Sequence, residues 1–142
     1  MKKSIVLISL FIAAISLSNM LKAQENKSEG IVFFEGSFED AMALAQKENK
    51  ILFLDAYASW CGPCKAMQKF SFTSEEVGNF YNQHFINVKI DMEKGEGPAL
   101  AEALKVEAYP TLYFISPERE VKLRAVGYQN PKSLLKIGSK IL

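Results

Sequence analysis

Hydrophobic and polar positions divide the chain into two parts. Residues 5–17 form an apolar run interrupted only by Ser9 and Ser16. From Ile31 onward, short apolar runs alternate with segments in which apolar side chains recur every three to four residues. This alternation of strand-like and helix-like patterns is typical of a layered α/β domain. A chain of 142 residues has room for one such domain, which we place at residues 31–142.

Five apolar runs predict strands, at residues 31–34, 51–57, 85–90, 111–115 and 121–126. The run 51–57 is apolar throughout except for Asp55, which predicts a central strand covered by helices on both faces. The last run alternates apolar with basic residues and follows the turn 116–120, so the last two strands are predicted to form a hairpin at the sheet edge. The expected architecture is a three-layer α/β/α sandwich around a mixed sheet.

Helices are predicted in the intervals between the strands. Ser37 with Asp40, and Thr73 with Glu76, have the spacing of capping boxes, and Gly97-Pro98 and Asn130-Pro131 are typical helix starts. Another helix is expected from Cys61 through Phe70. The predicted buried faces are Phe38, Ala41, Met42 and Ala45; Val77, Phe80 and Tyr81; Leu100, Ala103 and Leu104; and Leu134, Leu135, Ile141 and Leu142.

The N-terminal segment has the pattern of a secretory signal. Two lysines precede the apolar run, and Leu21-Lys22-Ala23 ends in a small residue. We therefore expect a signal peptide at residues 1–23, a flexible lead-in at residues 24–30, and a protein that is periplasmic or secreted. The alternative is an uncleaved N-terminal anchor that tethers the protein to the membrane, because the apolar stretch approaches the length of a short span.

Charge excludes one class of partner. The first 23 residues hold three of the 17 basic residues and none of the 16 acidic ones, so the remainder carries 14 basic and 16 acidic side chains, a formal charge of about −2. The sequence contains no basic cluster or stripe, and nucleic acid is not expected as a partner. The expected export says more about function than the net charge does, because it places the cysteines in a compartment where disulfides form and persist.

The two cysteines of the chain stand in the motif Trp60-Cys61-Gly62-Pro63-Cys64, directly after the predicted central strand. At such a strand-to-helix junction the first sulfur lies at a helix N-terminus, where free N–H groups and the helix dipole favour a thiolate, the nucleophilic form. A structural zinc site is disfavoured, because two cysteines and His84 supply at most three ligands. A disulfide with a purely structural role is disfavoured as well, because closing so short a loop removes little entropy from the unfolded chain. Redox chemistry is the preferred interpretation, without a metal or other cofactor.

This motif resembles that of the thioredoxin family, and the resemblance extends from about Ile31 to the C-terminus. It implies the thioredoxin fold and thiol–disulfide exchange. Asp55, six residues before Cys61, matches the family's buried carboxylate. Tyr109-Pro110-Thr111 matches its cis-proline segment, and Gly127 matches a glycine bordering the substrate groove. The chain departs from the family where Asn87 stands at the position of a lysine near the buried carboxylate.

The catalytic residues are predicted to be Cys61, Cys64 and Asp55. Cys61, exposed at the helix start, attacks a substrate sulfur, and Cys64 resolves the mixed disulfide. Burial of Asp55 would raise its pKa and allow it to take the proton from Cys64. The alternative is an inert carboxyl group hydrogen-bonded to backbone at the strand end.

The predicted substrate-binding residues are Trp60, Gly62, Pro63, Tyr109, Pro110 and Gly127. Trp60 is either a shield and groove wall or part of the core. The backbone at Tyr109 could pair with an extended substrate segment by strand addition. Lys65 is read as a solvated cation and His84 as a surface or helix-end residue.

Three functions fit these residues. The first is an exported reductase of protein disulfides, because Gly62-Pro63 resembles the dipeptide of strongly reducing thioredoxins. Such an enzyme needs an electron donor, for which a membrane thiol–disulfide reductase is one candidate. The second is an oxidase or isomerase of exported proteins, since the direction depends on redox potential rather than on the motif. The third is a peptide-binding scaffold with an incidental dithiol. The protein is expected to be a monomer.

Overall fold

The computed structural model describes residues 29–142, so the predicted signal peptide and most of the predicted lead-in lie outside the described residues. The described strands are β1 (Ile51–Tyr57), β2 (Phe85–Asp91), β3 (Thr111–Ile115) and β4 (Val121–Val126). The helices are α2 (Phe38–Glu48), α3 (Gly62–Ala66), the π-helix η1 (Met67–Ser71), α4 (Glu75–His84), α5 (Gly97–Leu104) and α6 (Pro131–Ile141).

The four strands form one mixed sheet in the order β2-β1-β3-β4. β1 pairs in parallel with β2 and antiparallel with β3, and β3 and β4 form the predicted antiparallel hairpin. β1 is therefore an inner strand, and every residue from Leu52 to Ala56 is buried. This agrees with the prediction of a central strand, because only a strand covered on both faces requires a continuous apolar run.

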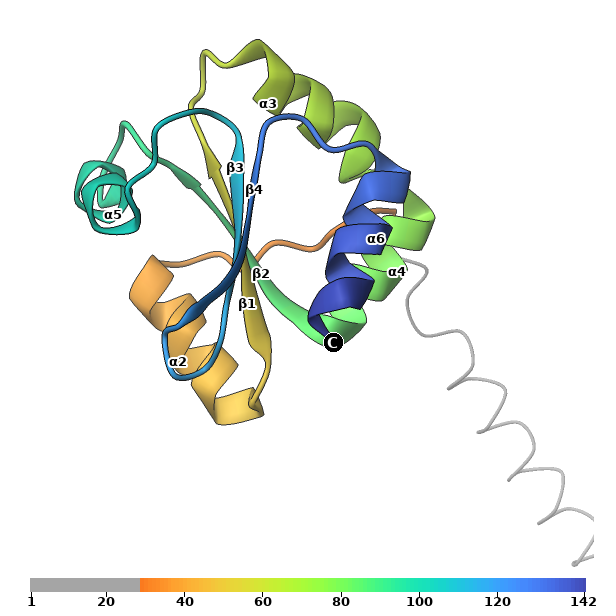
Figure 1. Cartoon of the computed structure of the whole chain (residues 1–142), viewed down its shortest axis with the longest axis horizontal. Coiled ribbons are helices and arrows are strands. Elements are labelled where there is room, and N and C mark those ends of the chain that lie inside the picture. Colours follow the sequence, from red (N-terminus) through yellow and green to blue (C-terminus); the bar gives the residue numbers. More distant parts are fainter. Residues whose placement is uncertain (1–28) are drawn as a thin grey trace, which may run out of the picture.

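Helices cover both faces of the sheet, which makes the predicted three layers. Figure 1 shows the sheet nearly edge-on, with α2 and α5 on one side and α3, α4 and α6 on the other. One core cluster contains the buried face of α2 and side chains of β1 and β2 that alternate with those of the opposite face. The second contains Phe53, Tyr81 and Leu134 and joins α4 and α6 to the sheet. The redox motif follows β1 and leads into α3.

Local signals locate most helix ends correctly. Ser37 caps α2 in a reciprocal capping box with Asp40, and Asn130 caps α6 by accepting a hydrogen bond from the Ser133 amide. α2 ends at Asn49, whose left-handed backbone is typical of a helix C-terminus. All four predicted inward residues of α2 are buried.

The prediction of a strand at residues 31–34 is wrong, because this segment is extended but is not part of the sheet. It lies along β2, where the Phe34 amide donates to the carbonyl of Asn87. At Val32, asparagine side chains take the place of backbone hydrogen bonds to a neighbouring strand. The Val32 amide donates to Asn82 Oδ1, and Asn87 Nδ2 donates to the Val32 carbonyl. Gly30, expected at the end of a flexible lead-in, is buried against the backbone of Phe72.

Three further expectations about the helices are wrong. Thr73 does not cap α4, because its hydroxyl donates to the Lys69 carbonyl within η1 and the N-cap residue is Ser74. Ala103 is exposed, since α5 is short and packs through Leu100 and Leu104. Leu142 is exposed because α6 ends before it, at Ile141.

Candidate active site

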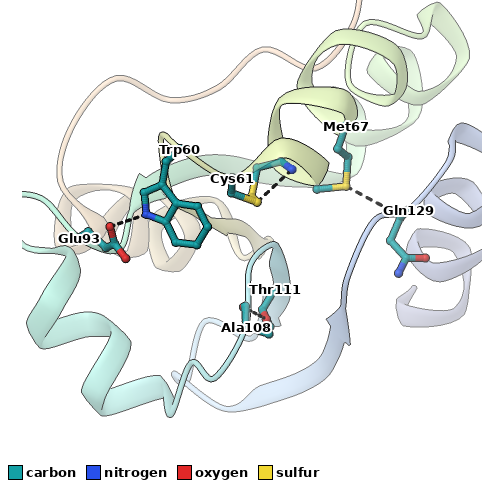
Figure 2. Close-up of a disulfide and its surroundings, with 8 residues drawn as sticks. Trp60, Cys61, Met67, Glu93, Ala108, Thr111 and Gln129 are labelled. Atoms are coloured by element: carbon teal, nitrogen blue, oxygen red, sulfur yellow. Dashed lines mark hydrogen bonds between the residues drawn. A yellow bond between two sulfur atoms is a disulfide. The ribbon is translucent and has the colours of Figure 1, made fainter.

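Cys61 and Cys64 form a disulfide, with their Cα atoms 5.3 Å apart. Cys61 is the N-cap residue of α3, and its Sγ accepts a hydrogen bond of 3.2 Å from the Cys64 amide. Figure 2 shows this bond at the start of the helix. An amide N–H directed at the first sulfur stabilises a negative charge there, so the local backbone favours the thiolate of Cys61 once the disulfide is reduced.

Cys61 is buried, with only 3% of its surface exposed, which corrects the expectation of an exposed sulfur. The disulfide packs against Ala58 and against the partly buried rings of Tyr57 and Tyr109. Gly62 and Pro63, between the two cysteines, are exposed. A substrate can therefore approach over the Gly-Pro turn.

Trp60 is not part of the core, because 66% of its surface is exposed. Its indole N–H donates a hydrogen bond of 2.7 Å to the Glu93 carboxylate (Figure 2). The Trp60 ring also meets the ring of Tyr109 edge-on, with the ring centres 6.1 Å apart. Glu93 lies in the loop after β2, where Lys94 also holds Ser59 by a hydrogen bond of 2.9 Å. These contacts fix Trp60 beside the redox pair. The role of Glu93 could not be predicted from the sequence, because the contact depends on the folded loop.

Asp55 is fully buried in β1, and neither carboxyl oxygen has a hydrogen-bond partner among residues 29–142. Burial raises the pKa of Asp55 from 3.8 to about 7, and the positive charge of Lys89 opposes this rise. Lys89 lies opposite Asp55 in the parallel pair of β1 and β2. Asn87 instead bonds Val32 and Asn82 at the margin of the sheet. The lysine electrostatically coupled to Asp55 is thus Lys89, which the sequence analysis did not identify.

The Tyr109-Pro110 peptide bond is cis, as the family resemblance implied. Pro110 is buried, and Tyr109 belongs to the cluster around the two cysteines. The Pro110 carbonyl accepts a hydrogen bond of 2.8 Å from the amide of Gly127, the residue after β4. Gly127 has φ +87°, a conformation that favours glycine, and a side chain there would point into open space. Three predicted site segments, at residues 60–64, 109–110 and 127, are thereby brought together.

Two residues of η1 support the same region. Ser71 is fully buried, and its hydroxyl donates to the Gln129 carbonyl at 2.7 Å. The Gln129 amide donates to the sulfur of Met67 at 3.4 Å, as Figure 2 shows. These contacts could not be predicted from local patterns, because they join positions about sixty residues apart.

The other two side chains singled out from the sequence have peripheral positions. Lys65 is exposed in α3. His84 ends α4, with its ring 4.8 Å from that of Phe80. Within residues 29–142 no three His, Cys, Asp or Glu side chains are grouped so as to hold a metal ion. In the same region no helix has the length and apolarity needed to cross a membrane.

Comparison with known proteins identifies the family. The family model Thioredox_DsbH, described as a protein of unknown function, DUF255, matches residues 18–130. A solved structure of a proposed disulphide-isomerase from Bacteroides thetaiotaomicron is 45% identical, with a TM-score of 0.69 over 80% of this chain and 96% of that one. A thioredoxin from Thermus thermophilus, 22% identical, has the same fold, with a TM-score of 0.71 over 79% of this chain and 87% of that one.

A curated relative is named for thiol–disulfide exchange. The thiol:disulfide interchange protein DsbD of Yersinia enterocolitica is 33% identical over 96 residues, which are 66% of this chain but 17% of that protein. The chain spans less than two thirds of the length of the first curated relatives it matches. The chain has the thioredoxin fold, belongs to the Thioredox_DsbH family of thioredoxin-like proteins, and is a thioredoxin-like disulfide oxidoreductase with the pair Cys61 and Cys64.

Proposed function

We propose that the protein reduces disulfides of other proteins outside the cytoplasm by dithiol–disulfide exchange. The observation that supports protein substrates is the exposure of large side chains on two segments around the redox pair. Trp60 is 66% exposed, and Val126 and Tyr128, on either side of Gly127, are 52% and 44% exposed. An open surface of this kind suits an extended protein segment better than a small molecule.

The exchange has two steps. The Cys61 thiolate attacks one sulfur of the substrate disulfide, the substrate S–S bond breaks, and the departing thiolate takes a proton. Cys64, after losing its proton to Asp55, attacks the Cys61 sulfur and releases the second substrate thiolate. The enzyme's dithiol is oxidised to the Cys61–Cys64 disulfide, and the substrate gains two electrons.

Substrate binding is assigned to the residues around the pair. The backbone of Tyr109 pairs with the substrate segment, and Gly127 borders the groove. Pro110, lacking an N–H, does not compete for the thiolate. Trp60 forms one wall of the groove, and the exposed Gly62-Pro63 turn admits the substrate sulfur.

The cellular setting is part of the same proposal. Residues 1–23 act as a signal peptide, or as an uncleaved anchor, and residues 31–142 form the domain. An electron donor re-reduces the disulfide, and a membrane thiol–disulfide reductase is the proposed class, supported by the likeness to DsbD. Mass spectrometry of the protein purified from its exported compartment distinguishes a cleaved chain from an anchored one.

A second candidate is oxidation or isomerisation of protein disulfides. It is favoured by the likeness to the proposed disulphide-isomerase of Bacteroides thetaiotaomicron, at 45% identity. A stabilised Cys61 thiolate also favours the reduced protein and so raises the reduction potential. The two candidates share the same residues and differ in the direction of electron flow.

The reduction potential of the Cys61/Cys64 couple separates the candidates. The protein is equilibrated in glutathione buffers of defined ratio, and the oxidised fraction is measured by alkylation and mass spectrometry. A value near roughly −270 mV supports the reductase. A value between about −180 and −120 mV identifies an oxidase or isomerase and overturns the reductase proposal.

Cys61→Ser tests whether the dithiol is needed at all. An enzyme loses activity completely with this change, whereas a peptide-binding scaffold keeps its affinity for partners. Retained cellular function in Cys61→Ser would support the scaffold and contradict both enzymatic candidates.

A further inference from the structure

The turn that contains Gly127 is hydrogen-bonded to the region of the redox site at both of its ends. Four residues, 127–130, join β4 to α6. At one end the Gly127 amide bonds the Pro110 carbonyl at 2.8 Å. At the other end Gln129 is held through its amide and its carbonyl by Met67 and Ser71 of η1. Since η1 continues directly from α3, the turn is tied to the helix that begins at the disulfide.

Ser71 makes the shortest of these hydrogen bonds. It is fully buried, and its hydroxyl lies 2.7 Å from the Gln129 carbonyl and 3.4 Å from the hydroxyl of Tyr128. A buried hydroxyl needs a hydrogen-bond partner, and removing it leaves the carbonyl that it satisfied without this donor. The side chain of Gln129 extends the connection, because its Nε2 donates to the Gly127 carbonyl at 3.3 Å.

The side chains of Met67 and Ser71 both come from the π-helix η1. π-helical segments are rare and occur frequently at functional sites. Met67 begins η1 and Ser71 ends it, and both are buried on the side that faces residues 128–129. The local widening of the helix therefore coincides with the residues that hold the substrate-side turn.

We propose that Ser71 is a positioning residue for protein substrates. Through Gln129 it fixes the Gly127 turn, one wall of the groove, relative to the redox helix. It does not touch the reacting sulfurs, so it acts on the binding of an extended protein segment and leaves the sulfur chemistry unchanged. This inference rests on the proposed exchange with protein disulfides.

Ser71→Ala tests the proposal with two disulfides of different size. The reduced protein is assayed with insulin, which needs the groove, and with 5,5′-dithiobis(2-nitrobenzoic acid), which needs only the sulfur. We expect KM for insulin to rise about threefold to tenfold, the range for one lost hydrogen bond, with kcat within about twofold of wild type. The rate with the small disulfide and the reduction potential stay unchanged.

Two variants keep the comparison interpretable. Ser139→Ala is the matched control, because Ser139 is exposed in α6 and its hydroxyl bonds only the Lys136 carbonyl within the helix. Met67→Leu removes the sulfur acceptor at similar volume and is expected to raise KM in the same direction, so the proposal can be tested even if Ser71→Ala does not fold.

Amide hydrogen exchange gives a readout that does not depend on the direction of catalysis. The Gly127 amide, bonded to Pro110, is expected to exchange faster in Ser71→Ala than in wild type and Ser139→Ala. If the Gly127 amide and the KM for insulin both match wild type in a folded Ser71→Ala protein, the proposal is overturned. Equal losses with insulin and the small disulfide, or a changed potential, also overturn it. Failure of wild type to reduce insulin contradicts the proposed reductase, while the Gly127 exchange still decides the role of Ser71.

Discussion

Asp55 of β1 lies opposite Lys89 of β2 in the parallel register, with the carboxyl group buried and the lysine exposed. Lys89 is the positive charge that partly offsets the burial of Asp55, and its ammonium also lies 5.3 Å from the centre of the Phe33 ring. The buried Asp55 is thus coupled to the surface charge of Lys89. Asp55 lies near the end of β1, the strand that leads to the cysteines.

The raised pKa of Asp55 predicts a stability that falls as pH rises. Because the pKa is about 7 in the folded protein and near 3.8 when unfolded, the folded state binds more protons between these values. The contribution of Asp55 is fully present below about pH 4 and is lost by pH 7, by at most roughly 4 kcal/mol. Urea unfolding of wild type and Asp55→Asn between pH 4 and 8 measures it. The variant should lose this part of the pH dependence; identical slopes for the two proteins would contradict the pKa.

Lys89→Gln is expected to raise the pKa of Asp55 further. Removal of the cation makes the ionised form of Asp55 less favourable. The pH at which the free energy of unfolding stops falling therefore moves upward. The change is less than about one pH unit, because Lys89 is exposed. Lys89→Arg keeps the charge and serves as the control. Direct titration of Asp55 by NMR checks the order Lys89→Gln above wild type and Lys89→Arg; no difference would exclude Lys89 as the coupled charge.

Asp55→Asn is also expected to slow resolution of the mixed disulfide, since an amide cannot take the proton from Cys64. A reduction of about a hundredfold at pH 7 is the lower end of the range for a lost general base. The wild-type rate should fall below pH 7 as Asp55 becomes protonated, and the variant should lack this dependence. Stopped-flow release of substrate from the preformed mixed disulfide measures the step, with Glu102→Gln, an exposed acid on α5, as control. Release at the wild-type rate in Asp55→Asn would remove Asp55 from the mechanism.

Glu93→Ala is expected to free Trp60 from its fixed position. The hydrogen bond of 2.7 Å is lost, and weaker binding of protein substrates, by about twofold to fivefold, follows from the mobile groove wall. Trp60 is the sole tryptophan, so quenching of its fluorescence by acrylamide reports its motion directly. Glu93→Gln retains an acceptor oxygen and should stay closer to wild type. If both variants quench like wild type, Glu93 does not hold the ring.

Gly78→Ala tests the docking of the N-terminal segment. A Cβ atom at Gly78 would lie 2.3 Å from the backbone of Gly30, so one of the two segments must move. We expect a loss of about 2 kcal/mol or more in the free energy of unfolding. Asn79→Ala, at the next, exposed position of α4, should be close to neutral. Chemical denaturation compares the two, and equal stability would show that residues 30–34 do not pack here.

Features that depend on neighbouring residues could be predicted from the amino-acid sequence. The boundaries of β1, β3 and β4, and the caps at Ser37 and Asn130, are as predicted, because strand patterns and capping pairs act over a few residues. The redox pair could be identified in the same way, since Cys61 and Cys64 share one helical turn after a buried strand.

Contacts between residues far apart in the chain became evident from the folded structure. Residues 31–34 have a strand's apolar pattern, yet asparagine side chains take most of the hydrogen bonds that a strand would make with β2. The coupling of Lys89 to Asp55 depends on the register of two strands, which a shift of one residue would change. The burial of Cys61 and the bond from Ser71 to Gln129 depend on packing between elements. Contacts of this kind are set by the balance of burial and hydrogen bonding over the whole core, which no local pattern encodes.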